Sequence, residues 1–377
     1  MPPPRLSPDV VIPPALLPAD GRFGCGPSKV RRGQVDALAA VGTTLLGTSH
    51  RQAPVRALVG RVREGLADLL GAPDGYEVVL GNGGATMFWD AAAFCLVEDR
   101  AQHLAFGEFG AKFASVTRRA PFLAEPTVRS ADPGALAHPA PEPGVDVYAW
   151  PQNETSTGVV APVRRVDGAD DGAIVLVDAT SAAGGVEVDL TQADAYYLSP
   201  QKNLGSDGGL WFAVLSPAAI ERVERVAASG RWVPDALSLP LALASSRKNE
   251  TVNTPAIATL VLMAEQLDWL ADQGGLDWAT ARTAESSGLL YEWAEKCDVA
   301  RPFVEKPDER SPVVVTIDLD DAVEAAVLAA ALRANGVLDV EPYRKLGRNQ
   351  IRVATFVGIE PRDVRALIAC LDFLLEQ

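Results

Sequence analysis

Five short apolar runs, separated by longer segments, restrict the fold of this 377-residue chain more than any other feature. They lie at Glu77–Leu80, Val145–Trp150, Ala173–Val177, Ala195–Ser199 and Gly209–Leu215. Runs of this length are typical of strands buried on both faces, and the segments between them are long enough for crossover helices. We therefore predict an α/β fold in which a mostly parallel sheet is sandwiched by helices.

The chain is too long for one small core and suits a large domain with a smaller one. Helical spacing predicts a helix from Pro54 to Leu70, and Thr254 as N-cap before Pro255 predicts the start of another. Beyond them, strands and helices are predicted at Val313–Leu319, Ala322–Ala334, Gln350–Phe356 and from Val364 to Leu375. We expect an N-terminal arm over residues 1–22, a large domain over 23–269 and a small C-terminal α+β domain over 270–377.

The charge balance excludes some classes of partner. There are 49 acidic and 34 basic residues, a net charge of -15, whereas a binder of nucleic acid or anionic membranes needs the opposite sign. The cysteines are scattered and the histidines have no metal-ligand spacing, so we expect reduced thiols, a cytoplasmic location and no metal site. No apolar run in the sequence is long enough to predict a membrane-spanning helix.

Two of the apolar runs end in residues that suit one kind of chemistry. Asp178 follows the run at 173–177, and Lys202 follows the run at 195–199. A lysine amine can form a Schiff base with the aldehyde of pyridoxal phosphate, and a carboxylate can keep the pyridinium nitrogen protonated. Lys202 alone is most simply a solvated loop residue. Its pairing with Asp178 favours a pyridoxal phosphate site.

Four further segments could bind anions, and three of them have a plainer structural interpretation. The glycine-rich segment 81–86 opens a helix after a strand and could hold a phosphate or form only a tight turn. Asn253-Thr254-Pro255 could bind a phosphate or only cap a helix. His50 and Arg51 together form a compact cationic site at a helix start. Arg352, in a predicted strand of an acidic protein, suits a carboxylate, although a solvent-facing arginine is about as good an interpretation.

Taken in order, these segments resemble the phosphoserine aminotransferase family, within the class V, fold-type I pyridoxal phosphate enzymes. The motifs are Gly47-Thr48-Ser49-His50-Arg51, Asn153-Glu154-Thr155, Ser199-Pro200-Gln201-Lys202-Asn203 and Asn253-Thr254-Pro255. The resemblance covers nearly the whole chain and is closest to the actinobacterial branch. It implies a seven-stranded sheet, a homodimer with shared active sites, and amino transfer between phosphoserine or 3-phosphooxypyruvate and glutamate or 2-oxoglutarate in serine biosynthesis. A further role in pyridoxine biosynthesis, on 4-phosphohydroxythreonine, stays open.

The same resemblance implies roles for individual residues. Lys202 is the Schiff-base lysine and Asp178 the partner of the pyridinium nitrogen. The other cofactor-binding residues that it implies are Gly84, Ala85, Phe109, Thr155, Gln201, Asn253 and Thr254, the last two from the neighbouring subunit. For the substrate, it implies that Arg352 binds the α-carboxylate. The substrate residues implied for the phosphate are His50 and Arg51 of the partner subunit, with Arg344 and Arg348 as further candidates.

Other functions remain open. An alanine–glyoxylate type aminotransferase would use Lys202 without needing a phosphate site at His50 and Arg51. A cysteine desulfurase would need a reactive cysteine in a mobile loop, and none of the four cysteines fits well. The interpretation as a nicotinamide dehydrogenase depends on the glycines at 81–84, and Thr86 in place of the third glycine of the dinucleotide-binding motif argues against it. A regulator that only carries the cofactor would keep Lys202 and need no cations for a substrate.

Overall fold

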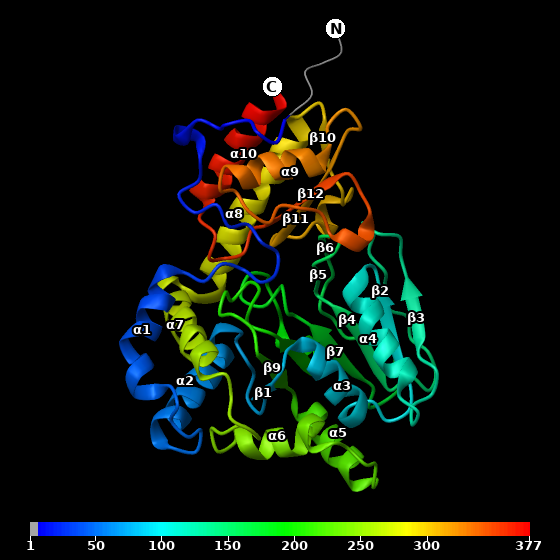
Figure 1. Cartoon of the computed structure of the whole chain (residues 1–377). Coiled ribbons are helices and arrows are strands. Elements are labelled where there is room, and N and C mark those ends of the chain that lie inside the picture. Colours follow the sequence, from blue (N-terminus) through cyan, green and yellow to red (C-terminus); the bar gives the residue numbers. More distant parts are fainter. Residues whose placement is uncertain (1–6) are drawn as a thin grey trace.

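The structure is a computed structural model that describes residues 7–377 (Figure 1). The first six residues of the predicted arm over 1–22 lie outside the described residues. The rest of the arm packs on the C-terminal part of the chain. The Ile12 N–H donates to Asn335 Oδ1 at 2.8 Å, and the Ala19 N–H donates to Asp363 Oδ1 at 3.0 Å. These contacts fasten the arm to the end of the chain farthest from it in sequence.

A seven-stranded sheet forms the centre of the molecule, with strand order β1-β9-β8-β7-β4-β2-β3. The strands are β1 (Glu77–Asn82), β2 (Ala101–Ala105), β3 (Thr127–Ser130), β4 (Val147–Pro151), β7 (Ile174–Asp178), β8 (Ala195–Leu198) and β9 (Leu210–Leu215). Strand β9 is antiparallel to β1 and β8, and the four other pairs are parallel. The predicted mostly parallel α/β sheet is confirmed.

Two strands of the sheet, β2 and β3, are not predicted by the hydrophobic pattern. Polar Gln102 and His103 interrupt the apolar run of β2, and both are buried through hydrogen bonds to Ala140 O and Thr117 Oγ1. Strand β3 is half-exposed at the sheet edge, so it has no apolar run to detect. Burial of polar groups by tertiary hydrogen bonds leaves no mark in a hydrophobic pattern.

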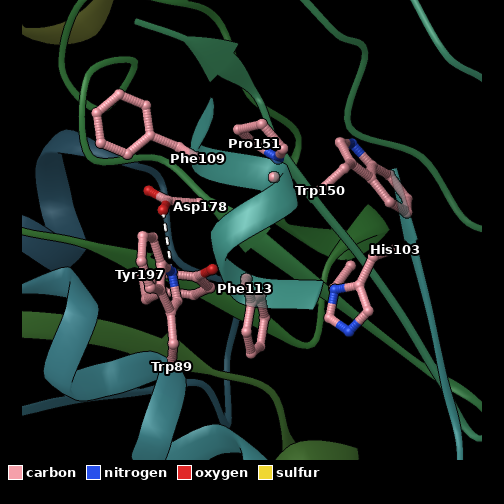
Figure 2. A pocket seen from close by; sticks show the side chains of 10 residues that line it. Trp89, His103, Phe109, Phe113, Trp150, Pro151, Asp178 and Tyr197 are labelled. Carbon is pink, nitrogen blue, oxygen red and sulfur yellow. Dashed lines mark hydrogen bonds between the residues drawn. The ribbon is translucent and has the colours of Figure 1, made fainter. Parts of the chain in front are cut away.

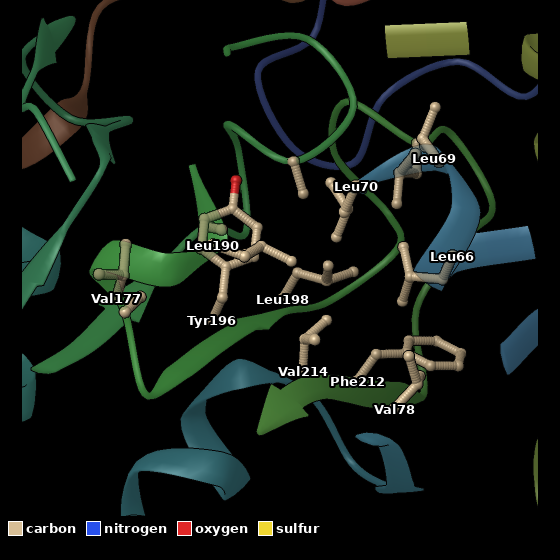
Figure 3. Close-up of a cluster of buried hydrophobic side chains, with 14 of the residues drawn as sticks. Leu66, Leu69, Leu70, Val78, Val177, Leu190, Tyr196, Leu198, Phe212 and Val214 are labelled. Atoms are coloured by element: carbon tan, nitrogen blue, oxygen red, sulfur yellow. The ribbon is translucent and has the colours of Figure 1, made fainter. Parts of the chain in front are cut away.

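Helices cover both faces of this sheet, because side chains along each strand alternate between two cores. On β8, Tyr196 packs into one core and Tyr197 into the other. The helices are α1 (Arg32–Leu45), α2 (Ala53–Leu69), α3 (Ala85–Cys95), α4 (Glu108–Arg119), α5 (Pro217–Ala228), α6 (Leu239–Ser246) and α7 (Ile257–Gln273). Figure 3 shows the first core, where Leu66 of α2 points toward Leu198 and Val214 of the sheet. The second core lies under α3, α5 and α6.

Helix α7 begins at Ile257 with Ala256 as N-cap, so the predicted cap at Thr254 with Pro255 as first helical residue is wrong. An N-cap carbonyl must accept the first helical N–H, and the Thr254 carbonyl instead accepts from Asn82 Nδ2 at 3.0 Å. Thr254 Oγ1 lies 3.3 Å from His50 Nδ1 rather than at a helix N–H. The segment before α7 is thus fixed to β1 and to the residues before α2.

The C-terminal part is a separate α+β layer, seen above the large sheet in Figure 1. It contains α8 (Gly275–Lys296), β10 (Ala300–Pro302), β11 (Val314–Leu319), α9 (Ala325–Ala334), β12 (Gln350–Ala354) and α10 (Pro361–Leu375). Its three strands are antiparallel in the order β10-β11-β12, over a third buried core. The division into domains at residue 270 stays a prediction; that residue lies within α7, and α7 and α8 meet at Gly274.

The remaining elements are short. A hairpin joins β5 (Asn153–Glu154) and β6 (Val159–Val160), and 3-10 helices lie at Pro14–Leu16, Leu190–Gln192, Asp235–Leu237, Pro307–Glu309 and Arg344–Leu346. Across residues 7–377, no helix is long and apolar enough to cross a membrane.

Candidate active site

A cavity lies where β7 and β8 end beside the start of α3. Asp178 is the last residue of β7, and Lys202 lies in the turn that follows β8, the parallel neighbour of β7. The cavity is lined by Gly84, Ala85, Thr86, Trp89, Phe109, Pro151, Asn153, Thr155, Asp178, Thr180, Ser181, Gln201 and Lys202. Every cofactor residue predicted from the same chain is in this set. Their individual roles stay predictions, but the structure brings them together.

Lys202 is buried at the floor of this cavity, where its amine has one hydroxyl partner. Its Nζ donates to Thr155 Oγ1 at 2.9 Å and lies 4.7 Å from the centre of the Phe109 ring. Burial, and after it the positive charge of Arg352, lower the pKa of Lys202 from 10.5 to about 8. A substantial fraction of this amine is therefore neutral near physiological pH, as proton transfer or attack on a carbonyl requires.

This lowered pKa predicts a pH dependence of stability in the cofactor-free protein. Between pH 8 and 10.5 the unfolded lysine still binds its proton while the folded one has released it, so stability rises with pH in that window. Below pH 8 the Lys202 amine is charged in both the folded and the unfolded state, so the folded state bears the full free-energy cost of burying that charge. Relative to Lys202→Met, the wild-type free energy of unfolding should rise by on the order of 3 kcal/mol across the window. Urea titrations at pH 7 to 10.5 measure it, and parallel curves for the two proteins would contradict it.

Asp178 is held in a fixed orientation by two donors, of which Figure 2 shows Trp89. Trp89 Nε1 donates to Asp178 Oδ2 at 3.2 Å, and the Thr180 N–H donates to Oδ1 at 2.9 Å. Burial raises the pKa of the Asp178 carboxyl, which these hydrogen bonds and Lys202 partly offset. A cationic ring nitrogen bound beside it would stabilise its charged form. Sequence analysis missed Trp89, since nothing local links it to a residue 89 positions later.

The rim of the cavity provides groups suited to a phosphate and to ring substituents. Helix α3 begins after Gly84, which has no side chain to cap the first N–H groups of the helix. Such an N-terminus favours an anion. Within residues 7–377, three buried side-chain oxygens at the lining have no hydrogen-bond partner: Asn153 Oδ1, Thr180 Oγ1 and Gln201 Oε1. Unpaired buried polar atoms of this kind fit a polar ligand.

Arg352 of β12, in the C-terminal layer, contacts a residue that lines this cavity. Its guanidinium donates to the carbonyl of Thr155 at 2.9 Å and lies 5.3 Å from the centre of the Tyr343 ring. Its Nε is buried and has no hydrogen-bond partner among the described residues. The backbone of Thr155 therefore holds Arg352, while the hydroxyl of the same residue holds Lys202. This geometry leaves guanidinium N–H groups for a carboxylate, as the strand pattern predicts.

Four predicted residues lie together outside this chain's cavity. His50 is buried and contacts Thr254, while Arg51 and Asn253 are exposed nearby in sequence. His50 Nε2 is buried without a hydrogen-bond partner in residues 7–377. None of the four lines the cavity around Lys202. They form a second polar cluster before α2 and α7.

Arg348, a predicted substrate contact, forms an ion pair with Asp318, and its role toward substrate stays a prediction. Arg348 Nε donates to Asp318 Oδ1 at 3.1 Å, and the guanidinium lies 4.6 Å from the centre of the Phe303 ring. A buried carboxylate on the neighbouring strand binds this arginine, which a sequence pattern cannot reveal. Arg344 is exposed at the start of the 3-10 helix Arg344–Leu346. In the described chain, no cluster of His, Cys, Asp and Glu could hold a metal ion.

Comparison with known proteins decides the family. The Aminotransferase class-V family matches residues 139–338. A phosphoserine aminotransferase of a Nocardioides species is 60% identical over 366 residues, which cover 97% of this chain and 98% of the relative. The chain belongs to the phosphoserine aminotransferase family of class V. A relative from Mycolicibacterium vanbaalenii is 63% identical over 366 residues, 97% of this chain and 98% of that one.

Structural comparison agrees on the fold of this aminotransferase. The crystal structure of a phosphoserine aminotransferase from Cytophaga hutchinsonii matches it with a TM-score of 0.87, over 94% of this chain and 99% of that chain. At 22% identity, that likeness supports the fold alone. The cofactor implied for such an enzyme, pyridoxal phosphate, fits the residues present: a buried amine, a buried carboxylate, an uncapped helix start and an aromatic ring around one cavity.

Proposed function

We propose that this protein is a phosphoserine aminotransferase that interconverts L-phosphoserine plus 2-oxoglutarate with 3-phosphooxypyruvate plus glutamate. The direction toward phosphoserine would serve serine biosynthesis, in the cytoplasm, where its four free thiols stay reduced. One observation carries the proposal: in a member of this family, buried Lys202 and Asp178 share a cavity, and Arg352 is hydrogen-bonded to Thr155 of the same lining.

Different residues of the cavity would bind different parts of the cofactor. When bound, pyridoxal phosphate supplies an electron sink for negative charge at the substrate's α-carbon. The start of α3 at Gly84 and the Gln201 side chain would hold its phosphate. The Asp178 carboxylate would pair with its ring nitrogen, and Phe109 would cover the ring. This arrangement places the amine of Lys202 at the reacting side.

The residues that act on the substrate follow from charge and position. Arg352 binds the α-carboxylate through two guanidinium N–H groups and so fixes the α-carbon near Lys202. The neutral amine of Lys202 would take the proton from that α-carbon and hold it inside the cavity for its return. Thr155, hydrogen-bonded to the amine at 2.9 Å, keeps it aimed during the transfer.

Selectivity for a phosphorylated substrate is the first test of this function. We expect wild-type protein to favour L-phosphoserine over L-serine by about 100-fold or more in kcat/KM, because a phosphate gains charge-assisted hydrogen bonds that a hydroxyl cannot. The double variant His50→Ala/Arg51→Ala should lose most of that ratio while serine turnover stays nearly constant. Coupled assays of glutamate formation measure both. If phosphoserine turnover survives unchanged, the phosphate site is assigned wrongly; if wild-type protein turns over neither amino acid, the function is wrong.

We also infer that the enzyme is a homodimer whose sites are shared. The cluster of His50, Arg51, Asn253 and Thr254 lies outside its own chain's cavity, and a two-fold assembly could bring it to the cavity of the partner subunit. In that arrangement the cluster supplies phosphate ligands, and the unpaired His50 Nε2 gains an acceptor.

Subunit complementation tests this arrangement. In a mixed dimer of Lys202→Ala and Arg51→Ala chains, one of the two sites contains only wild-type residues. An equal mixture that exchanges subunits should therefore recover about one quarter of wild-type activity from two nearly inactive parents. Each parent refolded alone is the control. Recovery no greater than the parents' mean would place Arg51 and Lys202 of one site in the same chain.

A further inference from the structure

The helix that carries Phe109 begins without a cap of its own. Its N-cap is Gly107, which has no side chain to accept a hydrogen bond from the first turn of α4. The first N–H groups of a helix need acceptors, particularly where the helix end is buried. Here the acceptors come from another part of the chain, the hairpin residues Glu154 and Ser156.

Glu154 and Ser156 together accept three successive backbone N–H groups of α4. Glu154 Oε2 accepts from Phe109 N at 3.0 Å and from Gly110 N at 3.1 Å, while Ser156 Oγ accepts from Glu108 N at 3.0 Å. The other carboxylate oxygen, Oε1, accepts from Ser156 N at 3.2 Å and from Ser156 Oγ at 2.6 Å. Glu154 is fully buried, at 0% exposure. Four donors surround this carboxylate, which matches a group that only accepts.

The backbone of α4 lies against this carboxylate so closely that only glycine fits. A Cβ atom on Gly107 would lie 2.3 Å from Glu154 Cγ and 2.5 Å from Ser156 Oγ. The contact between the hairpin and α4 therefore depends on the exact shape of both partners.

The capping contact involves or adjoins two residues that line the cofactor cavity, Phe109 and Thr155. Phe109, whose N–H is bound by Glu154, lies over the amine of Lys202, and Thr155, the next residue after Glu154, accepts a hydrogen bond from that amine. We propose that Glu154 is a positioning residue of the active site, which sets the Phe109 ring and the Thr155 hydroxyl relative to each other. The inference rests on the proposed function, since Phe109 is assigned to the cofactor ring.

The decisive variant is Glu154→Gln, which keeps the shape but presents an NH2 group to surrounding donors. We expect the protein to fold, to bind pyridoxal phosphate about 10-fold more weakly and to show a reduced visible circular dichroism band of the bound cofactor. Amide hydrogen exchange at residues 107–112 should quicken about 10-fold even in the cofactor-free protein. With phosphoserine, kcat should fall while KM changes little, because Phe109 does not touch the substrate's anionic groups.

A matched control separates positioning from general destabilisation. Asp146 is another carboxylate that accepts three backbone N–H groups, from Glu98, Asp99 and Arg100 at 2.9, 2.8 and 2.7 Å, but it lies before β4, outside the cavity. Asp146→Asn should lower thermal stability and leave the cofactor band and affinity unchanged. If Glu154→Gln also lowers only stability, the proposal is overturned.

Two further variants keep the proposal testable if Glu154→Gln does not fold. Ser156→Ala removes the hydroxyl that donates to Glu154 and accepts from Glu108 N. As in Glu154→Gln, cofactor binding should weaken and amide exchange should quicken, each by about 3-fold. Gly107→Ala displaces Glu154 without altering its chemistry and should act in the same direction more strongly. Unchanged exchange at 107–112 in both would contradict the proposal. A wild-type protein that binds no pyridoxal phosphate would instead refute the proposed function.

Discussion

Lys202→Ala should lower the rate of phosphoserine transamination by about 10⁴-fold or more, because the group that moves the α-proton is removed. Lys202 alone among the cavity residues combines burial with a pKa lowered to about 8, so no neighbour can replace it at physiological pH. Cofactor should still bind through the α3 start and Asp178, although more weakly. Single-turnover kinetics with L-phosphoserine separate the proton transfer from binding and product release.

Lys202→Arg is the matched control for this prediction. Arginine keeps the positive charge and most of the length, but its pKa is above 12, so it cannot act as a base near neutral pH. We expect it to be as inactive as the alanine variant. A small primary amine added to Lys202→Ala should restore a fraction of the rate, and added amine should leave Lys202→Arg inactive because its side chain fills the space. Activity above about one hundredth of wild type in either variant would mean that another base acts.

The parts of the fold that the sequence could predict are those set by the pattern of neighbouring residues. Strand β7 is apolar up to its last residue, Asp178, and strand β8 is a buried run that ends four residues before Lys202. The hydrophobic pattern alone is therefore enough to locate the ends of both strands. Parallel pairing then puts both ends on the same edge of the sheet, which is why the pair forms one site.

The sequence could not predict the hydrogen bonds of buried polar groups whose partners are far away along the chain. The donor of Trp89 to Asp178 and the acceptors of Glu154 for α4 are separated along the chain by 89 and 44 to 45 residues. Arg348 likewise has a partner distant in sequence, since its Nε donates to Asp318 Oδ1, 30 residues earlier. The alternation of apolar and polar residues predicts which face of a strand a side chain lies on. Which distant residue it contacts on that face depends on the tertiary fold.

Arg352→Ala should raise KM for both phosphoserine and glutamate by about 100-fold or more, because both share the α-carboxylate that the guanidinium binds. Losing the charge also has an effect on Lys202, whose pKa Arg352 lowers. In the cofactor-free protein, the pKa of the Lys202 amine should therefore be higher in Arg352→Ala, since a neighbouring positive charge is removed. The pH dependence of Lys202 labelling by an amine-reactive reagent, read by mass spectrometry, measures that rise. A purely structural role for Arg352 would raise KM without changing the pKa of Lys202.

Arg352→Lys distinguishes charge from geometry at this position. A lysine restores a positive charge, so the pKa of Lys202 in the cofactor-free protein should return toward its wild-type value. It lacks the planar fork of arginine, so KM should recover only in part. Arg301→Ala, an exposed arginine on β10 of the same small sheet, should leave both parameters unchanged. If Arg352→Lys restored KM fully, the carboxylate would be held by charge alone, and the hydrogen bond from Arg352 to the Thr155 carbonyl would serve only to hold the C-terminal layer against the cavity.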